Sequence, residues 1–148
     1  MLDIGDEILL VEDNPSDLEL AQRALREYNL GTKVQIARDG EEALDFIFCR
    51  EQFAGKRPGQ LPRVILLDLK LPLIDGMEVL RQVRADPRTH HVPVVVLTAS
   101  NEERDVAESY ALGVNSYITK PVDFDQFREA MRVIGTYWLV LNRSPCRT

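Results

Sequence analysis

The 148-residue sequence contains only two cysteines, Cys49 and Cys146, and they do not form a CxxC pair. This spacing indicates neither a disulfide framework nor a zinc site. The longest purely apolar runs, such as residues 92–97, have the length of a strand, whereas a membrane span needs roughly 20 apolar residues. The sequence therefore excludes a disulfide-stabilised scaffold and offers no segment that could cross a bilayer.

The sequence also lacks a basic region. Its 18 lysine and arginine residues are outnumbered by 24 aspartate and glutamate residues, and the net charge is −6. No run of Lys and Arg forms a patch suited to nucleic acid or to a membrane surface. Residues 1–7 lack the basic and then apolar pattern of a signal peptide. We expect a cytoplasmic protein that binds neither nucleic acid nor a membrane.

Five short apolar runs alternate with helical patterns along the chain. The runs are residues 8–11, 34–37, 64–67, 94–97 and 117–118. The alternation predicts an α/β fold with a doubly wound, five-stranded parallel sheet and helices on both of its faces. No linker to a second domain is visible, so we expect one domain over residues 1–148, with its core in 6–142 and a short tail at 143–148.

The sequence predicts where several helices begin. Four residues that favour the N-cap position precede helical patterns: Asn14, Asp39, Asp75 and Asp123. The segment from Ser100 to Glu103 predicts a capping box for the fourth helix. The last helix is expected to run from Asp123 to about Asn142.

Polar side chains follow four of the five apolar runs. Glu12 and Asp13 follow the first run, Asp68 the third, Thr98 the fourth and Lys120 the fifth. Because the carboxyl ends of parallel strands meet at one edge of a sheet, these residues are expected to share one crevice. Three carboxylates there would repel one another, and this favours a divalent cation with oxygen ligands, Mg²⁺ or Mn²⁺.

The same set of side chains suits phosphoryl chemistry. The Lys120 ammonium can pair with an anionic oxygen, and the Thr98 hydroxyl can reorient to donate to one. A metal ion, an ammonium and a hydroxyl together can neutralise a phosphoryl group during transfer. The Asp68 carboxylate is a competent nucleophile and would form an aspartyl phosphate.

Four segments occur in this order along the chain: ILLVEDNPSD, VILLDLKLPLIDG, VVVLTAS and NSYITKP. Together they resemble the receiver domain of two-component response regulators, in order and in spacing, over roughly residues 6–135. The resemblance implies a flavodoxin-like sheet with strand order 2-1-3-4-5 and phosphorylation of Asp68 by a sensor histidine kinase. It also implies that Asp13 binds Mg²⁺ directly, Glu12 through water, and Lys70 through its backbone carbonyl.

The resemblance further implies a switch. Lys120 would bridge to the phosphoryl group, and the Lys120–Pro121 peptide bond would be cis. Thr98 would move toward the phosphoryl oxygens, while Tyr117 would rotate inward into the vacated space. The positions of Lys70 and Ser100, two residues after Asp68 and Thr98, influence in this family how readily water attacks the phosphoaspartate.

The C-terminal part carries a narrower resemblance. The pattern there is Phe127-x₃-Met131-x₂-Ile134-Gly135-x-Tyr137-Trp138, and a long loop precedes the third apolar run, at residues 50–63. Both features are similar to single-domain regulators that partner phytochrome-type histidine kinases. The resemblance therefore implies a kinase of that type as the partner.

The last two helices carry more apolar side chains than one core contact needs. Val106 and Tyr110 lie four residues apart on one predicted helix, and Val133 and Tyr137 do so on the next. With Tyr117 on the last strand, they predict a surface for a homodimer or for another docking partner. The alternative is that the second apolar stripe simply packs under the C-terminal tail.

Two other functions remain open at this stage. A Mg²⁺-dependent phosphatase with an aspartate nucleophile would also use a strand-end Asp, a Thr or Ser and a Lys. It would need a second Asp two residues after the nucleophile, where this chain has Lys70. A degenerate receiver would act only as a protein scaffold. We expect instead a stand-alone phosphoacceptor switch, which is an enzyme only in promoting its own phosphotransfer and dephosphorylation.

Overall fold

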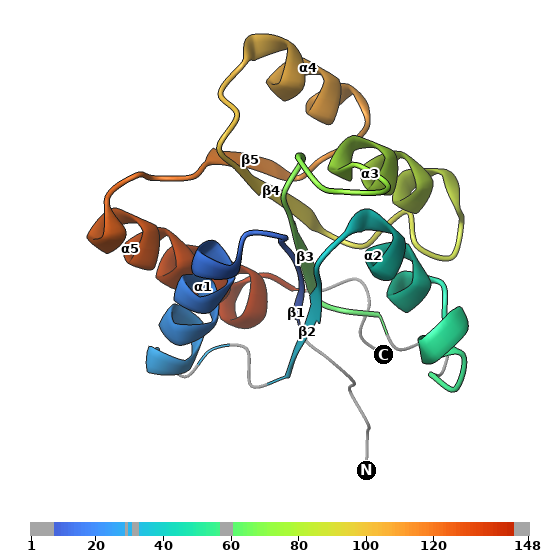
Figure 1. Ribbon diagram of the computed structural model, residues 1–148, viewed down its shortest axis with the longest axis horizontal. Coiled ribbons are helices and arrows are strands. Elements are labelled where there is room, and N and C mark those ends of the chain that lie inside the picture. The colour runs from blue at the N-terminus through green and yellow to red at the C-terminus, as the bar shows by residue number, and fades with distance from the viewer. Residues whose placement is uncertain (1–7, 29, 31–32, 57–60, 144–148) are drawn as a thin grey trace.

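The computed structural model describes residues 8–28, 30, 33–56 and 61–143, which form a five-stranded sheet with helices on both faces (Figure 1). The strands are β1 (Ile8–Val11), β2 (Val34–Ala37), β3 (Val64–Leu67), β4 (Val94–Thr98) and β5 (Ser116–Thr119). All neighbouring strands are parallel, and their order is β2-β1-β3-β4-β5. The predicted fold class and the strand order 2-1-3-4-5 are confirmed.

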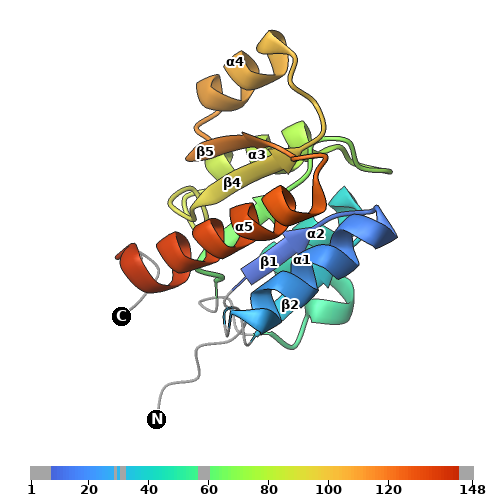
Figure 2. The same cartoon turned by 90° about the vertical axis from the view of Figure 1, so that its left-hand side faces the viewer.

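Five α-helices occur in the described part of the chain, four of them between strands and α5 after the last strand. They are α1 (Pro15–Glu27), α2 (Gly40–Ile47), α3 (Gly76–Ala85), α4 (Glu103–Ala111) and α5 (Phe124–Gly135). A 3₁₀ turn, η1 (Glu51–Phe53), lies in the long loop after α2, and a π-helical segment, η2 (Thr136–Leu141), follows α5. Helices α1 and α5 cover one face of the sheet, α2 and α3 cover the other, and α4 lies near its β5 edge (Figures 1 and 2).

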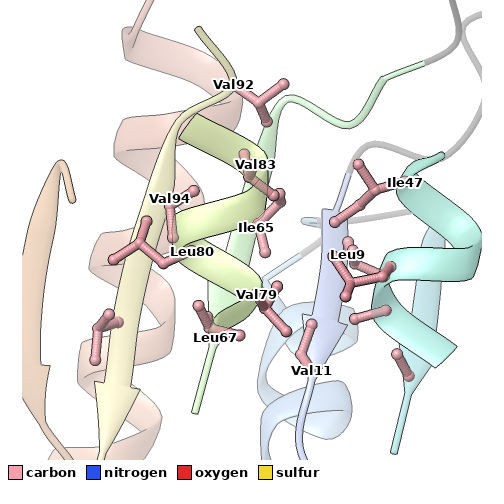
Figure 3. Close-up of a cluster of buried hydrophobic side chains, with 14 of the residues drawn as sticks. Leu9, Val11, Ile47, Ile65, Leu67, Val79, Leu80, Val83, Val92 and Val94 are labelled. Carbon is pink, nitrogen blue, oxygen red and sulfur yellow. The ribbon is translucent and has the colours of Figure 1, made fainter. Parts of the chain in front are cut away.

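The core alternates residue by residue along each central strand. Leu9 and Val11 of β1 face α2 and α3, whereas Ile8 and Leu10 face α1 and α5. Both sides are fully buried, as expected for parallel strands covered on two faces. Figure 3 shows the first of these cores, where Leu80 of α3 packs among side chains of the central strands.

Side-chain caps fix where four of the helices begin. The carboxamide oxygen of Asn14 and the carboxylates of Asp39, Asp75 and Asp123 each accept a backbone N–H from the first turn, over 2.7–3.0 Å. These four predicted N-caps are confirmed. Each satisfies an N–H group that the helix itself leaves unpaired.

The predicted capping box at Ser100 is wrong. Helix α4 begins at Glu103, and its N-cap residue Glu102 makes no side-chain cap hydrogen bond. The Ser100 hydroxyl donates instead to the Asp105 carboxylate over 2.6 Å. A buried carboxylate in the first turn of α4 itself has therefore taken the hydroxyl that the sequence pattern would assign to the helix cap.

The last helix ends earlier than predicted. Helix α5 stops at Gly135, and the chain continues as the wider π-helical turn of η2. A β-carbon at Gly135 would lie 2.8 Å from the end of the Leu30 side chain, so a larger residue here would have to displace that side chain. Arg63, just before β3, donates to the Leu139 carbonyl over 2.6 Å and holds η2 there. Residues 1–7 and 144–148, with Cys146, lie outside the described residues.

The described residues contain no cis peptide bond, so the expected cis bond between Lys120 and Pro121 is not found. The trans isomer is the one that an X–Pro bond prefers by ~0.5–1 kcal/mol. In this geometry the Lys120 ammonium still reaches the carboxylates at the sheet edge, as described below.

Helix α4 is attached differently from the other helices. Its only described buried residues are Asp105 and Ser109, both polar, and the Ser109 hydroxyl donates to the Met77 sulfur over 3.7 Å. The turn that follows α4 is fixed by Arg84 of α3. Its guanidinium donates to the Gly113 carbonyl and to the Asn115 side chain, both over 2.8 Å.

None of the helices in the described ranges is both long enough and apolar enough to span a bilayer.

The buried core gives a direct test of the fold. We expect Leu80→Ala to lower the free energy of unfolding by about 2–5 kcal/mol, because Leu80 is fully buried and its loss leaves a cavity. Leu73→Ala is the matched control: Leu73 is 76% exposed, and its truncation should change stability by less than about 0.5 kcal/mol. Urea unfolding of both variants measures the difference, and equal losses would contradict this core.

Candidate functional site

The carboxyl ends of the strands bring the predicted side chains together around Asp68. Asp68 follows β3 and is 7% exposed. Thr98, the last residue of β4, donates its hydroxyl to Asp68 Oδ1 over 2.8 Å. Lys120, directly after β5, places its Nζ 3.1 Å from Asp68 Oδ2. Each oxygen of the Asp68 carboxylate therefore accepts a hydrogen bond from a different strand end.

Lys120 is shared by three carboxylates. Its Nζ lies 2.7 Å from Glu12 Oε1 and 2.8 Å from Asp17 Oδ2, in addition to its contact with Asp68. The Lys120 side chain is 9% exposed, so these ion pairs are screened little by water. One ammonium cannot neutralise three carboxylates, and the cluster keeps an excess of negative charge.

Asp17 was not among the predicted site residues. It lies in the first turn of α1, and its backbone N–H is capped by Asn14. The available signal was its position: α1 begins two residues after Asp13, so its N-terminal turn must lie at the same sheet edge. Acidic residues are common in the first turn of any helix because they interact favourably with the helix dipole. The presence of Asp17 there therefore did not identify it as a site residue.

The electrostatics of the cluster shift two pKa values. Burial, together with the neighbouring Asp68 charge, raises the pKa of the Glu12 carboxyl to about 7 against the opposing effect of Lys120. Burial alone would lower the pKa of Lys120. Hydrogen bonds to Asp17 and Glu12, with the charge of Asp68, raise it above its usual value instead. Lys120 therefore stays an ammonium, and a proton competes with any cation for Glu12.

The donor set fits a hard divalent cation. Carboxylate oxygens of Glu12, Asp13 and Asp68 lie within 4.8 Å of one another, and they form the one such group among the described residues. An all-oxygen set suits Mg²⁺ or Mn²⁺ and does not suit metals that prefer thiolate or imidazole. Glu12 and Asp68 are buried and Asp13 is exposed, so an ion there would keep positions open to water or to a ligand.

Lys70, in the loop after β3, also contacts the site. The Lys70 backbone N–H donates to Asp68 Oδ1 over 3.2 Å, while its ammonium lies 3.8 Å from Asp105 Oδ2. Lys70 and Asp105 line, with Asp13, a cavity of about 580 Å³ beside the site. The role assigned to the Lys70 backbone carbonyl stays a prediction.

Tyr117 is half-buried against the core on the α2 and α3 face. Its hydroxyl donates to the Ser100 carbonyl over 2.8 Å, which joins β5 to the loop between β4 and α4. Burial raises the pKa of the Tyr117 hydroxyl, so it remains a donor. Its part in a switch also stays a prediction.

The predicted interface residues lie apart from the site, on α4, β5, α5 and η2. Tyr110, Val133 and Tyr137 are 52%, 51% and 47% exposed, which is high for large apolar side chains. Val106 and Tyr117 are half-buried.

The family model of the response regulator receiver domain matches residues 8–132 of this chain. The chain belongs to the response regulator receiver family.

Two relatives of this receiver domain span most of its length. It is 43% identical to the probable methanogenesis regulatory protein FilR2 of Methanothrix harundinacea, over 93% of this chain and 86% of FilR2. It is 39% identical to response regulator Rcp1 of Synechocystis, over 89% of this chain and 88% of Rcp1. These alignments cover nearly the whole of each protein.

Solved structures agree with the fold. The phosphorylated cyanobacterial phytochrome response regulator RcpA superposes with a TM-score of 0.88 at 39% identity, covering 95% of this chain and 99% of RcpA. The Mn²⁺-bound form of Rcp1 superposes with a TM-score of 0.86 at 38% identity, covering 93% of this chain and 97% of Rcp1.

The acidic set can be tested without assuming any function. We expect Asp13→Asn to weaken Mg²⁺ binding at least about tenfold, because even outer-shell changes at metal sites cost that much. Asp125→Asn on α5 removes the same charge from a side chain that is 83% exposed, and it should leave the affinity unchanged. Isothermal titration calorimetry with Mg²⁺ measures both. Equal affinities in the two variants would rule out Asp13 as a ligand.

Proposed function

We propose that this receiver domain is a stand-alone phosphorylation switch, which accepts a phosphoryl group on Asp68 from a sensor histidine kinase. The observation that supports it most is the setting of the Asp68 carboxylate. One oxygen accepts from the Thr98 hydroxyl and the other from the Lys120 ammonium, beside an acidic set that fits Mg²⁺. A carboxylate held in this way is positioned as a nucleophile with charge-stabilising donors already in place.

The proposed transfer is an exchange of one phosphorus bond for another. An Asp68 oxygen attacks the phosphorus of a phosphohistidine, the new P–O bond forms, and the P–N bond breaks as the imidazole nitrogen leaves. Lys120 stays protonated and pairs with a phosphoryl oxygen, while the Thr98 hydroxyl donates to another. Mg²⁺ held by Glu12, Asp13, Asp68 and the Lys70 carbonyl would supply charge neutralisation when bound.

The proposed response to phosphorylation involves Thr98 and Tyr117. Thr98 already contacts the Asp68 carboxylate, and Tyr117 already bonds to the Ser100 carbonyl in the loop that Thr98 begins. A new dianion on Asp68 would strengthen the pull on Thr98 and so favour one arrangement of that loop over another.

The proposed partner is a phytochrome-type histidine kinase, acting in the cytoplasm. RcpA, which covers nearly all of this chain, is described as a phytochrome response regulator, and the long loop and C-terminal pattern point the same way. FilR2 is described differently, as a regulator of methanogenesis. Phosphotransfer assays with a phytochrome kinase and an unrelated histidine kinase compare the two possibilities.

The phosphoacceptor can be tested directly. Acetyl phosphate with Mg²⁺ should label the parent protein, and Asp68→Asn or removal of Mg²⁺ with a chelator should abolish the labelling. Asp75→Asn, a change of the same kind in an exposed helix cap, should retain it. Intact-mass spectrometry measures the added phosphoryl group. A parent protein that folds and binds Mg²⁺ but is not labelled would favour a scaffold without phosphorylation.

The same protein can be tested for enzymatic turnover. An aspartate-nucleophile phosphatase needs a second carboxyl group as general acid two residues after the nucleophile, and Lys70 cannot fill that role. We therefore propose that turnover is limited to the domain's own phosphoaspartate. Hydrolysis of p-nitrophenyl phosphate above background, lost in Asp68→Asn, would contradict this.

We also propose that the exposed apolar side chains on α4, α5 and η2 form a homodimer surface with β5. Val133 and Tyr137 lie one turn apart and are about half exposed, beside the ring contact of Tyr137 with Trp138. An apolar patch of this kind on a small domain usually marks an interface.

The dimer proposal has a matched pair of variants. Val133→Asp should give a monomer in sedimentation experiments, because a charge would be buried at the interface. Leu73→Asp, at a site 76% exposed in the loop after β3, should leave the assembly unchanged. A parent protein that is monomeric at high concentration, with and without acetyl phosphate, would overturn the proposal.

A further inference from the structure

Asp105 of α4 is one of the few charged residues of this domain that are buried, at 8% exposure, and the proposed phosphotransfer does not use it. Its Oδ2 atom accepts the Ser100 hydroxyl over 2.6 Å and lies 3.8 Å from the Lys70 ammonium. It therefore connects the two residues that lie two positions after Asp68 and two positions after Thr98. These residues belong to different loops, one leaving β3 and one leaving β4.

We propose that Asp105 is a positioning residue that competes with the phosphoryl group on Asp68 for the Lys70 ammonium. Without phosphate, Lys70 pairs with Asp105 and ties the β3–α3 loop to α4. With phosphate, Lys70 turns to the phosphoryl oxygens and leaves Asp105. The inference rests on the proposed function, because it concerns the group that Asp68 would carry.

The Lys70 side chain has more conformational freedom than the Asp105 side chain. The Asp105 side chain is 11% exposed and is held by Ser100, whereas the Lys70 side chain is 68% exposed. The Lys70 backbone is already at the site, because its N–H donates to Asp68 Oδ1. The long flexible side chain therefore starts beside the phosphoacceptor and can move, while the carboxylate stays.

Charge favours the exchange. A phosphoryl group carries close to two negative charges, against one on Asp105, and offers three acceptor oxygens. The Lys70–Asp105 pair is largely exposed on the lysine side, so its own strength is modest. Lys70 and Asp105 line the same cavity, and Asp13 of the acidic set lines it with them.

The loss of this pair matters for α4 because the helix has little else to hold it. The described residues that α4 buries are both polar, Asp105 and Ser109, and no large apolar side chain of α4 is buried. Elements with few apolar contacts are the ones most readily displaced. Asp105 remains bonded to Ser100, whose carbonyl accepts the Tyr117 hydroxyl, so a change at α4 is linked to β5.

Binding of beryllofluoride, a phosphoryl mimic, in the presence of Mg²⁺ tests the proposal on the intact domain. Asp105→Asn keeps a hydrogen-bond acceptor for Ser100 but removes the charge that attracts Lys70. We expect it to bind beryllofluoride about two- to fivefold more tightly than the parent, in line with the strength of an exposed ion pair. Lys70→Met should bind it more weakly.

A general field effect must be separated from competition for Lys70. Glu108→Gln removes the same charge from the same helix and cavity, but Glu108 pairs with Arg81 rather than with Lys70. It should leave the beryllofluoride affinity unchanged. In a Lys70→Met background, Asp105→Asn should then have no further effect, because the shared cation is gone.

Three results with these variants would contradict competition for Lys70. An unchanged affinity in Asp105→Asn, an equal gain in Glu108→Gln, or a gain that persists without Lys70 would overturn the inference. Thermal unfolding of the free variants identifies a purely structural role, which would lower stability without changing the affinity. If Asp105→Asn does not fold, Lys70→Met still tests the inference, because it alters an exposed side chain. A beryllofluoride affinity of Lys70→Met equal to that of the parent would overturn the inference by itself. A parent protein that binds no beryllofluoride with Mg²⁺ would instead contradict the proposed function.

Discussion

The ammonium of Lys120 is the contact on which the rest of the site depends. It holds Glu12, Asp17 and Asp68 at one sheet edge, although each carboxylate comes from a different element. The parallel topology brings Glu12, Asp68 and Lys120 together at the carboxyl ends of β1, β3 and β5, and Asp17 joins them from the start of α1. One ammonium among several carboxylates leaves an excess of negative charge at this edge. Attraction for a further cation therefore follows from the arrangement of the strand ends in this fold.

The molecule combines a rigid part with a loosely attached one. The central strands are buried on both faces, and α1, α2, α3 and α5 each contribute large apolar side chains to one of the two cores. Helix α4 contributes none among the described residues, and polar contacts hold it instead. Its far end is fixed by the Arg84 guanidinium through Gly113 and Asn115. A charge change at the sheet edge therefore acts on a helix whose first turn is held by the polar contacts of Asp105 and whose far end is held by Arg84.

Much of this architecture could be predicted from the sequence because the signals were local. Apolar runs coincide with the strands, and caps such as Asn14 act within a few residues of their own position. The failures came where a side chain took a partner that local spacing did not indicate. Ser100 bonds to buried Asp105, five residues further along in α4, instead of capping the helix, and Asp17 contacts Lys120 across 103 positions of sequence. Convergence at strand ends could be inferred from topology alone, but the identity of every side chain that meets there could not.

The only tryptophan of the sequence lies in η2, and its position has an experimental consequence. Trp138 packs partly against the α1 and α5 core and meets the Tyr137 ring edge-on at 4.9 Å. Arg63, at the amino end of β3, bonds to the neighbouring Leu139 carbonyl, which places η2 at the opposite edge of the sheet from Asp68. Its indole fluorescence is thus a native optical probe remote from the chemistry. An emission change on phosphorylation, measured at a protein concentration where the assembly state does not change, would report a rearrangement transmitted through the body of the domain.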